Sequence, residues 1–500
     1  MKTAFGIGIA IVVAIVIVTV IVTVIAIAVG LAPSPAHARE LWSSQDETFA
    51  LEGGGYVKSQ LLGMHFRDLW LYDWISGDDS VDSGGMSVTR ARIGGDAYWN
   101  DFRLGLEYEL SAMVMSSALE DMQSGGAFGG TGSASGSGAG NGSGGDEGSG
   151  ASGLSMLGLS GTARPRLWDP DPHRGDGIWL EHNIDRAFVH LPFGPVDLRI
   201  GRQAISWGTA WFWKPTDRFS PFSPTDIDPD VKRGVDAVRA EIFLGERTSL
   251  DLVGSFERHE GVGGAGESGG SAIENREWWA HGGMRFRTGI GRYDLAVSAA
   301  RFQMSQQGNW MAGLETTGPL GPLGFRAEAA FNFMEESHDW DIEAVAGLDY
   351  RFPFGLMVAG EAFYNGYGSD DPDEYLGYYM DMSDPFAGKM PEKGERLARG
   401  ETFNIGRYYL GLALDQEVVP VLHVTLSAVG NLIDPSGFLM AGLDWSVVEN
   451  ARFSAGALVP LGEKSTGPGL DALPVPSSFD LSSEYGLMPV MGFAVLKLAY

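Results

Sequence analysis

The sequence predicts an all-β protein, a transmembrane antiparallel up-and-down β-barrel of about 18 strands. Three observations predict it. Many short segments alternate apolar with polar side chains, which is the period of a strand. The connections between these segments alternate between short and long. After residue 38, no apolar run is long enough to cross a membrane as a helix, so a membrane-spanning chain would cross as strands.

Composition narrows the class of protein further. The chain has 500 residues, a formal net charge of −29 and no cysteine. A strongly acidic chain lacks the basic surface that binding to a phosphate backbone needs, so a nucleic-acid partner is excluded. Disulfides contribute nothing to its stability, because there is no cysteine to form them.

The first 38 residues predict a cleavable signal peptide. Lys2 precedes a continuous apolar stretch over 4–31, and the small-residue sequence PSPAHA ends at Ala38. The stretch is long for a signal peptide, so an uncleaved inner-membrane anchor is the alternative. Residues 39–500 are predicted to form one barrel domain.

The segment FRLGLEYEL over 102–110 shows the strand pattern most clearly, with Phe102, Leu104, Leu106, Tyr108 and Leu110 on one face. Similar segments recur in pairs joined by tight turns such as PFGP, GER and TGIG. The long connections are predicted at 65–85, 112–182, 203–233, 257–277, 366–406 and 461–487. Short periplasmic turns and long external loops are typical of outer-membrane barrels, and a β-sandwich does not sort its loops in this way.

The polar face of the predicted strands carries charged residues of both signs, which a water-filled lumen tolerates. The predicted pore-lining residues are Arg90, Arg92, Arg103, Glu107, Glu109, Arg186, Arg199, Arg239, Glu241, Asp251, Arg285, Arg287, Arg326, Glu328 and Glu361. Two arrangements are open. A positive strip facing an acidic strip would orient dipolar solutes, whereas cross-strand ion pairs would only satisfy a polar interior. The second arrangement is favoured.

A Trp- and Pro-rich stretch at 203–233 is predicted to fold into the lumen as a constriction loop. Its aromatic residues are Trp207, Trp211, Trp213, Phe219 and Phe222, and four prolines stiffen it. The functional interpretation is a narrowed pore with a surface on which a sugar or an aromatic solute can stack. The structural interpretation is a cluster that braces the inner wall, and the two are compatible.

This stretch also carries a family resemblance. GRQAISWG followed by PTDRFSPFSPTD resembles the strand-and-loop motif of porin-like outer-membrane barrels, distantly similar to the 18-stranded alginate-export type. The resemblance covers about 40 residues and implies an outer-membrane channel without giving a substrate. True alginate exporters have an arginine-rich lumen, whereas here Arg is mixed with Glu and Asp. The closing strand, which ends on Tyr500, resembles the carboxyl-terminal signature by which such barrels are recognised for insertion.

Other segments contribute less. The tract over 123–153 is rich in Gly and Ser and is predicted to be an external loop insertion. The acidic runs at 76–85 and 369–375, with Asp226, Asp228 and Asp230, are interpreted as solvated loops. Calcium held by the last two groups is the alternative, and no other metal or cofactor is predicted. No HExxH, GxSxG or P-loop motif occurs, so no enzyme activity is predicted.

The predicted function is passive passage of small hydrophilic solutes through the outer membrane of a Gram-negative bacterium. The alternative is a structural or adhesive surface barrel with a plugged lumen. The expected partners are outer-membrane lipid, lipopolysaccharide, the barrel-assembly machinery and a small-molecule or oligosaccharide solute. Both a monomer and a trimer are compatible with the sequence.

Overall fold

The structure is a computed structural model of the chain. The residues that it describes are 39–46, 48–66, 83–117, 119, 173–175, 178–220, 232–261, 275–304, 308–375, 378, 396, 401–463 and 483–500. The predicted signal peptide, the 123–153 insertion and Phe222 lie outside the described residues, as do Asp226, Asp228 and Asp230.

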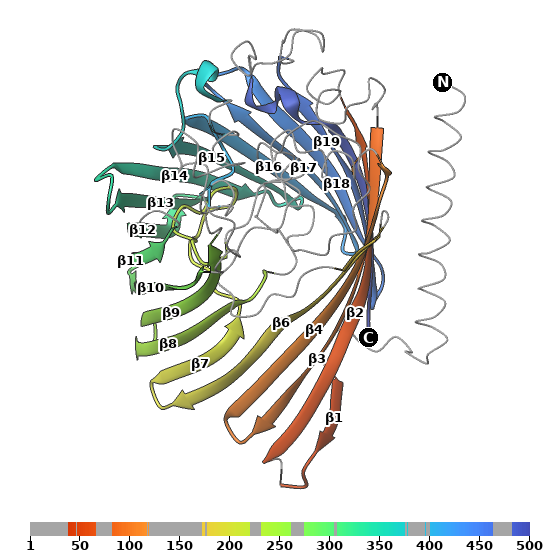
Figure 1. The fold of residues 1–500 in the computed structure, drawn as a ribbon, viewed down its shortest axis with the longest axis vertical. Helices are drawn as coiled ribbons and strands as arrows, with labels where there is room; N and C mark the ends of the chain where they lie inside the picture. Colours follow the sequence, from red (N-terminus) through yellow and green to blue (C-terminus); the bar gives the residue numbers. More distant parts are fainter. Residues whose placement is uncertain are drawn as a thin grey trace, which may run out of the picture.

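The described chain is almost entirely β-structure (Figure 1). Its strands are β1 (Arg39–Ser43), β2 (Phe49–His65), β3 (Ser83–Trp99), β4 (Phe102–Met115), β5 (His173–Gly175), β6 (Ile178–Phe193), β7 (Val196–Gln203), β8 (Val235–Gly245), β9 (Thr248–Gly261), β10 (Asn275–Ile290), β11 (Tyr293–Gln303), β12 (Gly308–Leu320), β13 (Leu323–Met334), β14 (Trp340–Arg351), β15 (Leu356–Asn365), β16 (Tyr408–Val419), β17 (Leu422–Asn431), β18 (Ser436–Val448), β19 (Ala451–Leu461) and β20 (Val490–Ala499). Two short 3₁₀-helices, η1 (Pro372–Glu374) and η4 (Glu484–Leu487), lie in the connections.

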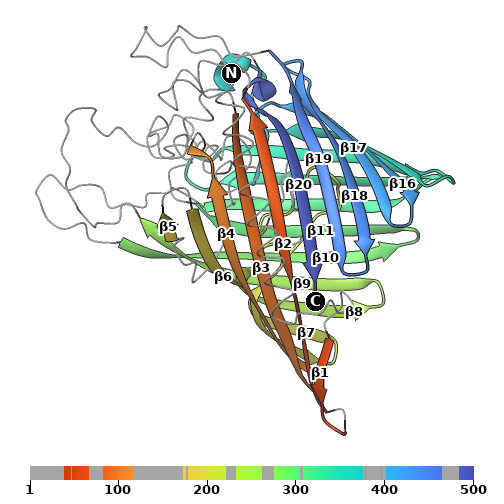
Figure 2. The same cartoon turned by 90° about the vertical axis from the view of Figure 1, so that its right-hand side faces the viewer.

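The strands close into a ring. Each strand pairs antiparallel with its neighbour along the chain, and β20 pairs with both β19 and β2 (Figure 2). The short strands β1 and β5 pair only with β2 and β6, so the closed barrel has 18 strands, as the sequence predicts. The sequence pattern did not reveal β1 and β5. At the seam, the Gly55 and Tyr500 backbones exchange two hydrogen bonds of 3.0 and 2.9 Å.

The two ends of the barrel differ in their connections. At one end, every connection between barrel strands is a turn of two to four residues, such as Asn100–Asp101 or Gly194–Pro195, and β1 joins β2 through five residues. At the other end the strand bounds leave six long connections (66–82, 116–177, 204–234, 262–274, 366–407 and 462–489) and three short ones (304–307, 335–339 and 432–435). The first barrel strand starts, and the last one finishes, at the turn end. These ends are called the turn end and the loop end below.

The two faces of the wall differ in polarity. In β4, Leu104, Leu106 and Leu110 are exposed on the outside, whereas Glu107 and Glu109 of the same strand contact arginines inside. Other strands repeat the apolar exterior, for example Leu410 and Leu412 in β16. An apolar outside with charges inside is the arrangement of a barrel that is surrounded by lipid. Within the described residues, no helix is long and apolar enough to cross a membrane.

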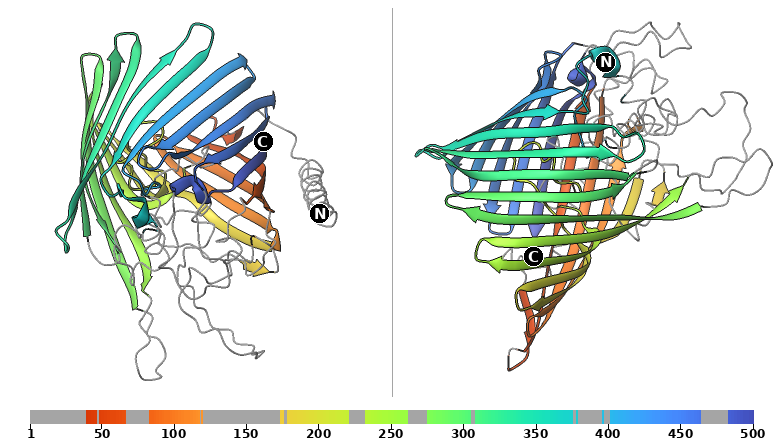
Figure 3. Two further views of the ribbon diagram at one scale, coloured as in Figure 1. Left: turned by 90° about the horizontal axis from the view of Figure 1, so that it is seen from above. Right: turned by 90° about the vertical axis from the view of Figure 1, so that its left-hand side faces the viewer.

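Seen from above, the strands surround an interior into which the connection between β7 and β8 runs (Figure 3). The interior is not uniform. Toward the loop end it is lined by a cluster of buried apolar side chains that includes Met64, Phe438 and Met491. Toward the turn end it is lined by charged residues such as Arg103, Arg287 and Arg326. These regions are called the loop half and the turn half of the interior.

Candidate functional site

The connection between β7 and β8, residues 204–234, is called the inserted loop, and the part of it that the structure describes lies inside the barrel. Its described residues are 204–220 and 232–234. Trp207, Trp213 and Phe219 are all at least 97% buried, whereas 45% of the Trp211 surface is exposed. The hydrogen bonds of the inserted loop reach side chains of β9, β13 and β15, which belong to different parts of the wall. The loop therefore crosses the interior.

Two wall carboxylates hold the inserted loop by its backbone. Oε1 of Glu328 in β13 accepts hydrogen bonds from the backbone N–H groups of Thr209 and Ala210. In β15, Oε1 and Oε2 of Glu361 accept from the N–H groups of Trp211 and Phe212 at 2.5 and 2.8 Å. Four successive amides are thus satisfied by two carboxylates. Charge-assisted bonds of this kind are stronger than neutral ones, so they fix the loop to the wall.

Aromatic packing fixes the same loop at two further points. The Trp213 ring stacks on Phe363 of β15, with centroids 5.1 Å apart, and its Nε1–H donates to Oδ1 of Asn404 at 2.7 Å. The Trp207 Nε1–H donates to Oδ2 of Asp251 at 3.1 Å, and its ring meets Phe219 edge to face. An aromatic ring that is buried with its N–H satisfied contributes both area and specificity.

Two glycines of the wall make room for these rings. A Cβ atom on Gly283 of β10 would lie 2.7 Å from the Trp207 ring. A Cβ atom on Gly411 of β16 would lie 2.7 Å from Phe212 and 3.0 Å from Trp213. Since these three distances are shorter than normal carbon contacts, a larger residue at either position would push the inserted loop away from the wall.

A cluster of buried charges joins the inserted loop to the connection between β15 and β16. Arg218 of the inserted loop donates through Nη1 to Oε2 of Glu401 at 2.9 Å and through Nη2 to Oδ1 of Asn332 at 2.6 Å. Nη2 of Arg396 donates to Oε2 of Glu343 in β14 at 2.7 Å. All four charged side chains are at least 97% buried. Buried charges persist only when they are paired in this way.

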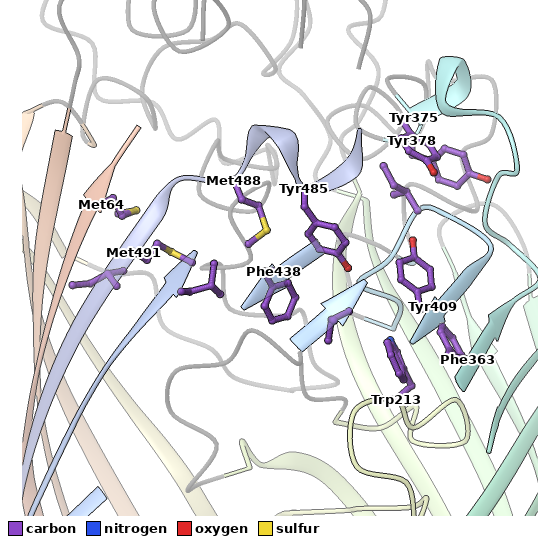
Figure 4. Close-up of a cluster of buried hydrophobic side chains, with 14 of the residues drawn as sticks. Met64, Trp213, Phe363, Tyr375, Tyr378, Tyr409, Phe438, Tyr485, Met488 and Met491 are labelled. Atoms are coloured by element: carbon purple, nitrogen blue, oxygen red, sulfur yellow. The ribbon is translucent and has the colours of Figure 1, made fainter. Parts of the chain in front are cut away.

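The loop half of the interior is filled with apolar and aromatic side chains (Figure 4). Tyr485 and Met488, which precede β20, lie above Phe438, and Tyr409 lies beside Phe363 and Trp213. Glu484 is buried in this cluster. Its carboxylate accepts hydrogen bonds from the Tyr409 hydroxyl at 2.5 Å and from Nδ2 of Asn431 at 2.8 Å. The segment before β20 is thereby tied to the wall.

The turn half contains ion pairs that join nearby strands, apart from Arg239–Glu241, whose two residues both lie in β8. Most of the predicted lining residues lie here, and the pairs that they form are Arg90–Glu109, Arg92–Glu107, Arg92–Glu109, Arg103–Asp96, Arg239–Asp251, Arg239–Glu241, Arg285–Glu315, Arg287–Glu241 and Arg326–Asp349. Arg186 contacts Asp185, and the Arg199 guanidinium lies 4.9 Å from the centre of the Phe188 ring. The arginines therefore pair with carboxylates, almost all of them on nearby strands, and do not form a positive strip opposite an acidic strip.

In the acidic run at 369–375, all four carboxylates are exposed. Asp371 caps η1 by accepting from the Asp373 N–H at 3.1 Å, and Asp370 is exposed. Ser369 and Tyr375, however, are buried, with Tyr375 in the apolar cluster of the loop half. In the described part of the chain, no group of three or more acidic or histidine side chains is placed to hold a metal ion.

Three histidines of the wall each lie near a carboxylate. The contacts are His190 Nε2 with Asp197 at 3.6 Å, His281 Nε2 with Glu257 at 3.2 Å, and His423 Nδ1 with Asp415 at 3.5 Å. Sequence spacing missed these contacts because they join different strands. It also missed Arg218, Arg396 and Glu343, whose partners lie far away in the chain.

A polar cavity of about 580 Å³ lies between the inserted loop and the wall of β8 to β12, near the turn end. Arg285, Arg287 and Glu315 lie along it. Space of this size is within the range of small-molecule sites.

The comparisons with known proteins give a likeness of fold only. Neither a protein-family model nor a curated protein matches the chain. Among solved structures, it is similar to Acinetobacter baumannii OccAB1 (7% identity, 94% of this chain and 99% of that chain, TM-score 0.48). It is also similar to Pseudomonas aeruginosa OccK5, or OpdH (8%, 90% and 97%, 0.47), and to Salmonella typhi OmpF solved in complex with daunomycin (8%, 92% and 100%, 0.40).

Proposed function

We propose that the chain is an outer-membrane channel for the passive passage of small hydrophilic solutes, narrowed by the inserted loop. The observation that carries this proposal is the polar turn half of a closed barrel, which contains a cavity of about 580 Å³ beside the inserted loop. Charged side chains along a lumen keep it hydrated, and an apolar exterior suits lipid. The lining and constricting roles of the residues named above belong to this proposal.

The proposal includes the partners of the barrel. The apolar exterior would contact lipid and the lipid part of lipopolysaccharide. The barrel-assembly machinery would recognise the strand that ends near Tyr500. The inserted loop would act as the constriction because Glu328 and Glu361 hold it across the interior. No catalytic role is proposed for any residue.

A plugged barrel that displays its loops is the second candidate, and one observation favours it. The loop half is filled by a buried cluster that includes Trp213, Tyr409 and Tyr485. Side chains packed at this density leave little room for a solute. In that case the working surface would be the long connections at the loop end.

Single-channel conductance of residues 39–500 in planar bilayers separates the two candidates. The chain is measured intact and after deletion of 207–229. We expect a steady conductance that increases on deletion, because the segment that crosses the interior is removed. A chain that conducts in neither form would overturn the channel and favour the plugged barrel.

A further inference from the structure

The cavity of the turn half is bounded by two different parts of the chain. On one side it is lined by Ser206, Gly208 and Thr209 of the inserted loop, and on the other by Arg285, Arg287 and Thr317 of the wall. Glu246 and Arg247 of the β8–β9 turn line its turn-end side. A solute held in this cavity would therefore contact both the inserted loop and the wall.

The charges that line the cavity balance. Three arginines (Arg247, Arg285 and Arg287) face three carboxylates (Glu246, Asp294 and Glu315). Arg285 forms a bidentate salt bridge with Glu315, in which Nε donates to Oε1 at 2.9 Å and Nη2 donates to Oε2 at 2.6 Å. Arg247 contacts Asp294 at 2.8 Å. An ionic solute would have to compete with these partners, so the cavity favours a solute without net charge.

The hydrogen-bonding groups of the cavity are still available to a ligand. Among the residues that the structure describes, the hydroxyls of Ser206, Ser249 and Thr317 form no hydrogen bond with another protein group. The Arg287 side chain is 49% exposed, and its Nη2 lies 3.7 Å from Oε1 of Glu241. Hydroxyls both donate and accept, whereas a guanidinium only donates. The mixture suits a ligand whose own groups both donate and accept.

We propose that this cavity is a binding subsite for an uncharged, polyhydroxylated solute of monosaccharide to disaccharide size. Each solute hydroxyl can donate to Ser249 or Thr317 and accept from Arg287, and the balanced charge disfavours anions and cations alike. The inference rests on the proposed function and deepens it, since it names the class of solute that the channel retains beside the inserted loop.

Isothermal titration calorimetry of the detergent-solubilised chain tests the subsite without requiring conduction. The probes are D-glucose, maltose and, as an anion of similar size, D-gluconate. We expect heat of binding with glucose or maltose that exceeds the heat with gluconate. Thr317→Val and Ser249→Ala should each weaken sugar binding about five-fold, the loss expected for one neutral hydrogen bond.

Thr425→Val is the matched control, because Thr425 lies in β17 and outside the cavity. It should leave sugar affinity unchanged. No sugar binding by the intact chain, tighter binding of gluconate, or equal affinity in all three variants would each overturn the subsite. Conductance is recorded separately on the same preparations. A chain that conducts without binding sugar defeats only the subsite, and one that binds sugar without conducting defeats only the channel.

Discussion

The two halves of the interior are built by different means. In the turn half, charged side chains of nearby strands pair with each other, and several remain partly exposed, as Arg287 and Arg103 do. In the loop half, charged groups such as Arg396 and Glu343 are fully buried, and the Arg396 guanidinium lies 3.6 Å from the centre of the Tyr367 ring. Strand alternation therefore determines which side chains face inward. The loops that return into the barrel determine whether those side chains are buried or exposed to water.

The largest effect should follow from removing a buried charge in the loop half. Arg396→Ala leaves Glu343 and Glu401 without one of their cationic partners in a buried site. We expect a loss of about 3–5 kcal/mol in the free energy of unfolding, measured by urea denaturation in detergent micelles.

Arg351→Ala is the control in the turn half, because Arg351 is exposed near a turn. Its effect should be within about 0.5 kcal/mol. If the two substitutions destabilised the barrel equally, the distinction between the halves would be wrong.

The next largest effect should come from the aromatic contact of the inserted loop. Trp213→Ala removes the stacking on Phe363 and the hydrogen bond to Asn404. It also leaves a cavity in a buried cluster, which costs about 3 kcal/mol.

Trp211→Ala changes the same residue type two positions away, where 45% of the surface is exposed. Urea denaturation should show a much smaller loss for this variant. Equal losses would mean that the inserted loop is not anchored by Trp213.

A smaller effect should follow from weakening the carboxylate that holds the loop backbone. Glu361→Gln places an amide NH₂ opposite one of the N–H donors of Trp211 and Phe212. We expect a loss of about 2 kcal/mol and larger current fluctuations in single-channel records, because the inserted loop is held less firmly.

The exposed Glu417, at the turn end of β16, provides the matched substitution Glu417→Gln. This variant should have the same free energy of unfolding as the unsubstituted chain, and its single-channel records should show the same current noise. If the current fluctuations of Glu361→Gln were no larger than those of the unsubstituted chain, the anchoring role of Glu361 would be contradicted.

A pH dependence should be confined to the segment before β20. Burial raises the pKa of Glu484 from 4.5 to about 7, and the nearby carboxylate of Asp434 adds to the shift. Because the folded state holds the proton more tightly, this contribution to stability is complete below about pH 4.5 and is lost as the pH rises through about 7.

Hydrogen–deuterium exchange at the Glu484 amide, which donates to Oδ2 of Asp434, measures this dependence. After correction for intrinsic exchange rates, protection should fall between pH 5 and pH 8. Glu484→Gln should show no such fall. If protection fell equally in the Glu484→Gln variant and in the unsubstituted chain, the pH dependence would belong to another group.

The sequence predicts the fold well because alternation is a local property. The segment over 102–110 lies within β4, with its leucines outside as expected. The loop half was not predicted, although a signal existed. Leu61, Leu62 and Met64 place apolar residues on both faces at the loop end of β2, which indicates an interior that is apolar there.

The candidate site was predicted in part. Glu328 and Glu361 belong to the inward face of their strands, which alternation indicates. Their partners are backbone amides of the inserted loop, and no side-chain pattern encodes such a contact. Arg396 and Glu343 are 53 residues apart in the chain, so only the folded barrel brings them together.

The seam between β2 and β20 has a consequence for the order in which the barrel folds. Tyr56 pairs with Ala499 and Met64 with Met491, so closing the ring joins segments that are separated by nearly the whole chain. Such distant contacts form slowly, because the entropy of ordering the intervening chain is lost before they contribute. Until then, β2 and β20 each present an unpaired edge that a bilayer cannot hydrogen-bond. We therefore expect the open barrel, before β2 pairs with β20, to be the species that depends most on a chaperone.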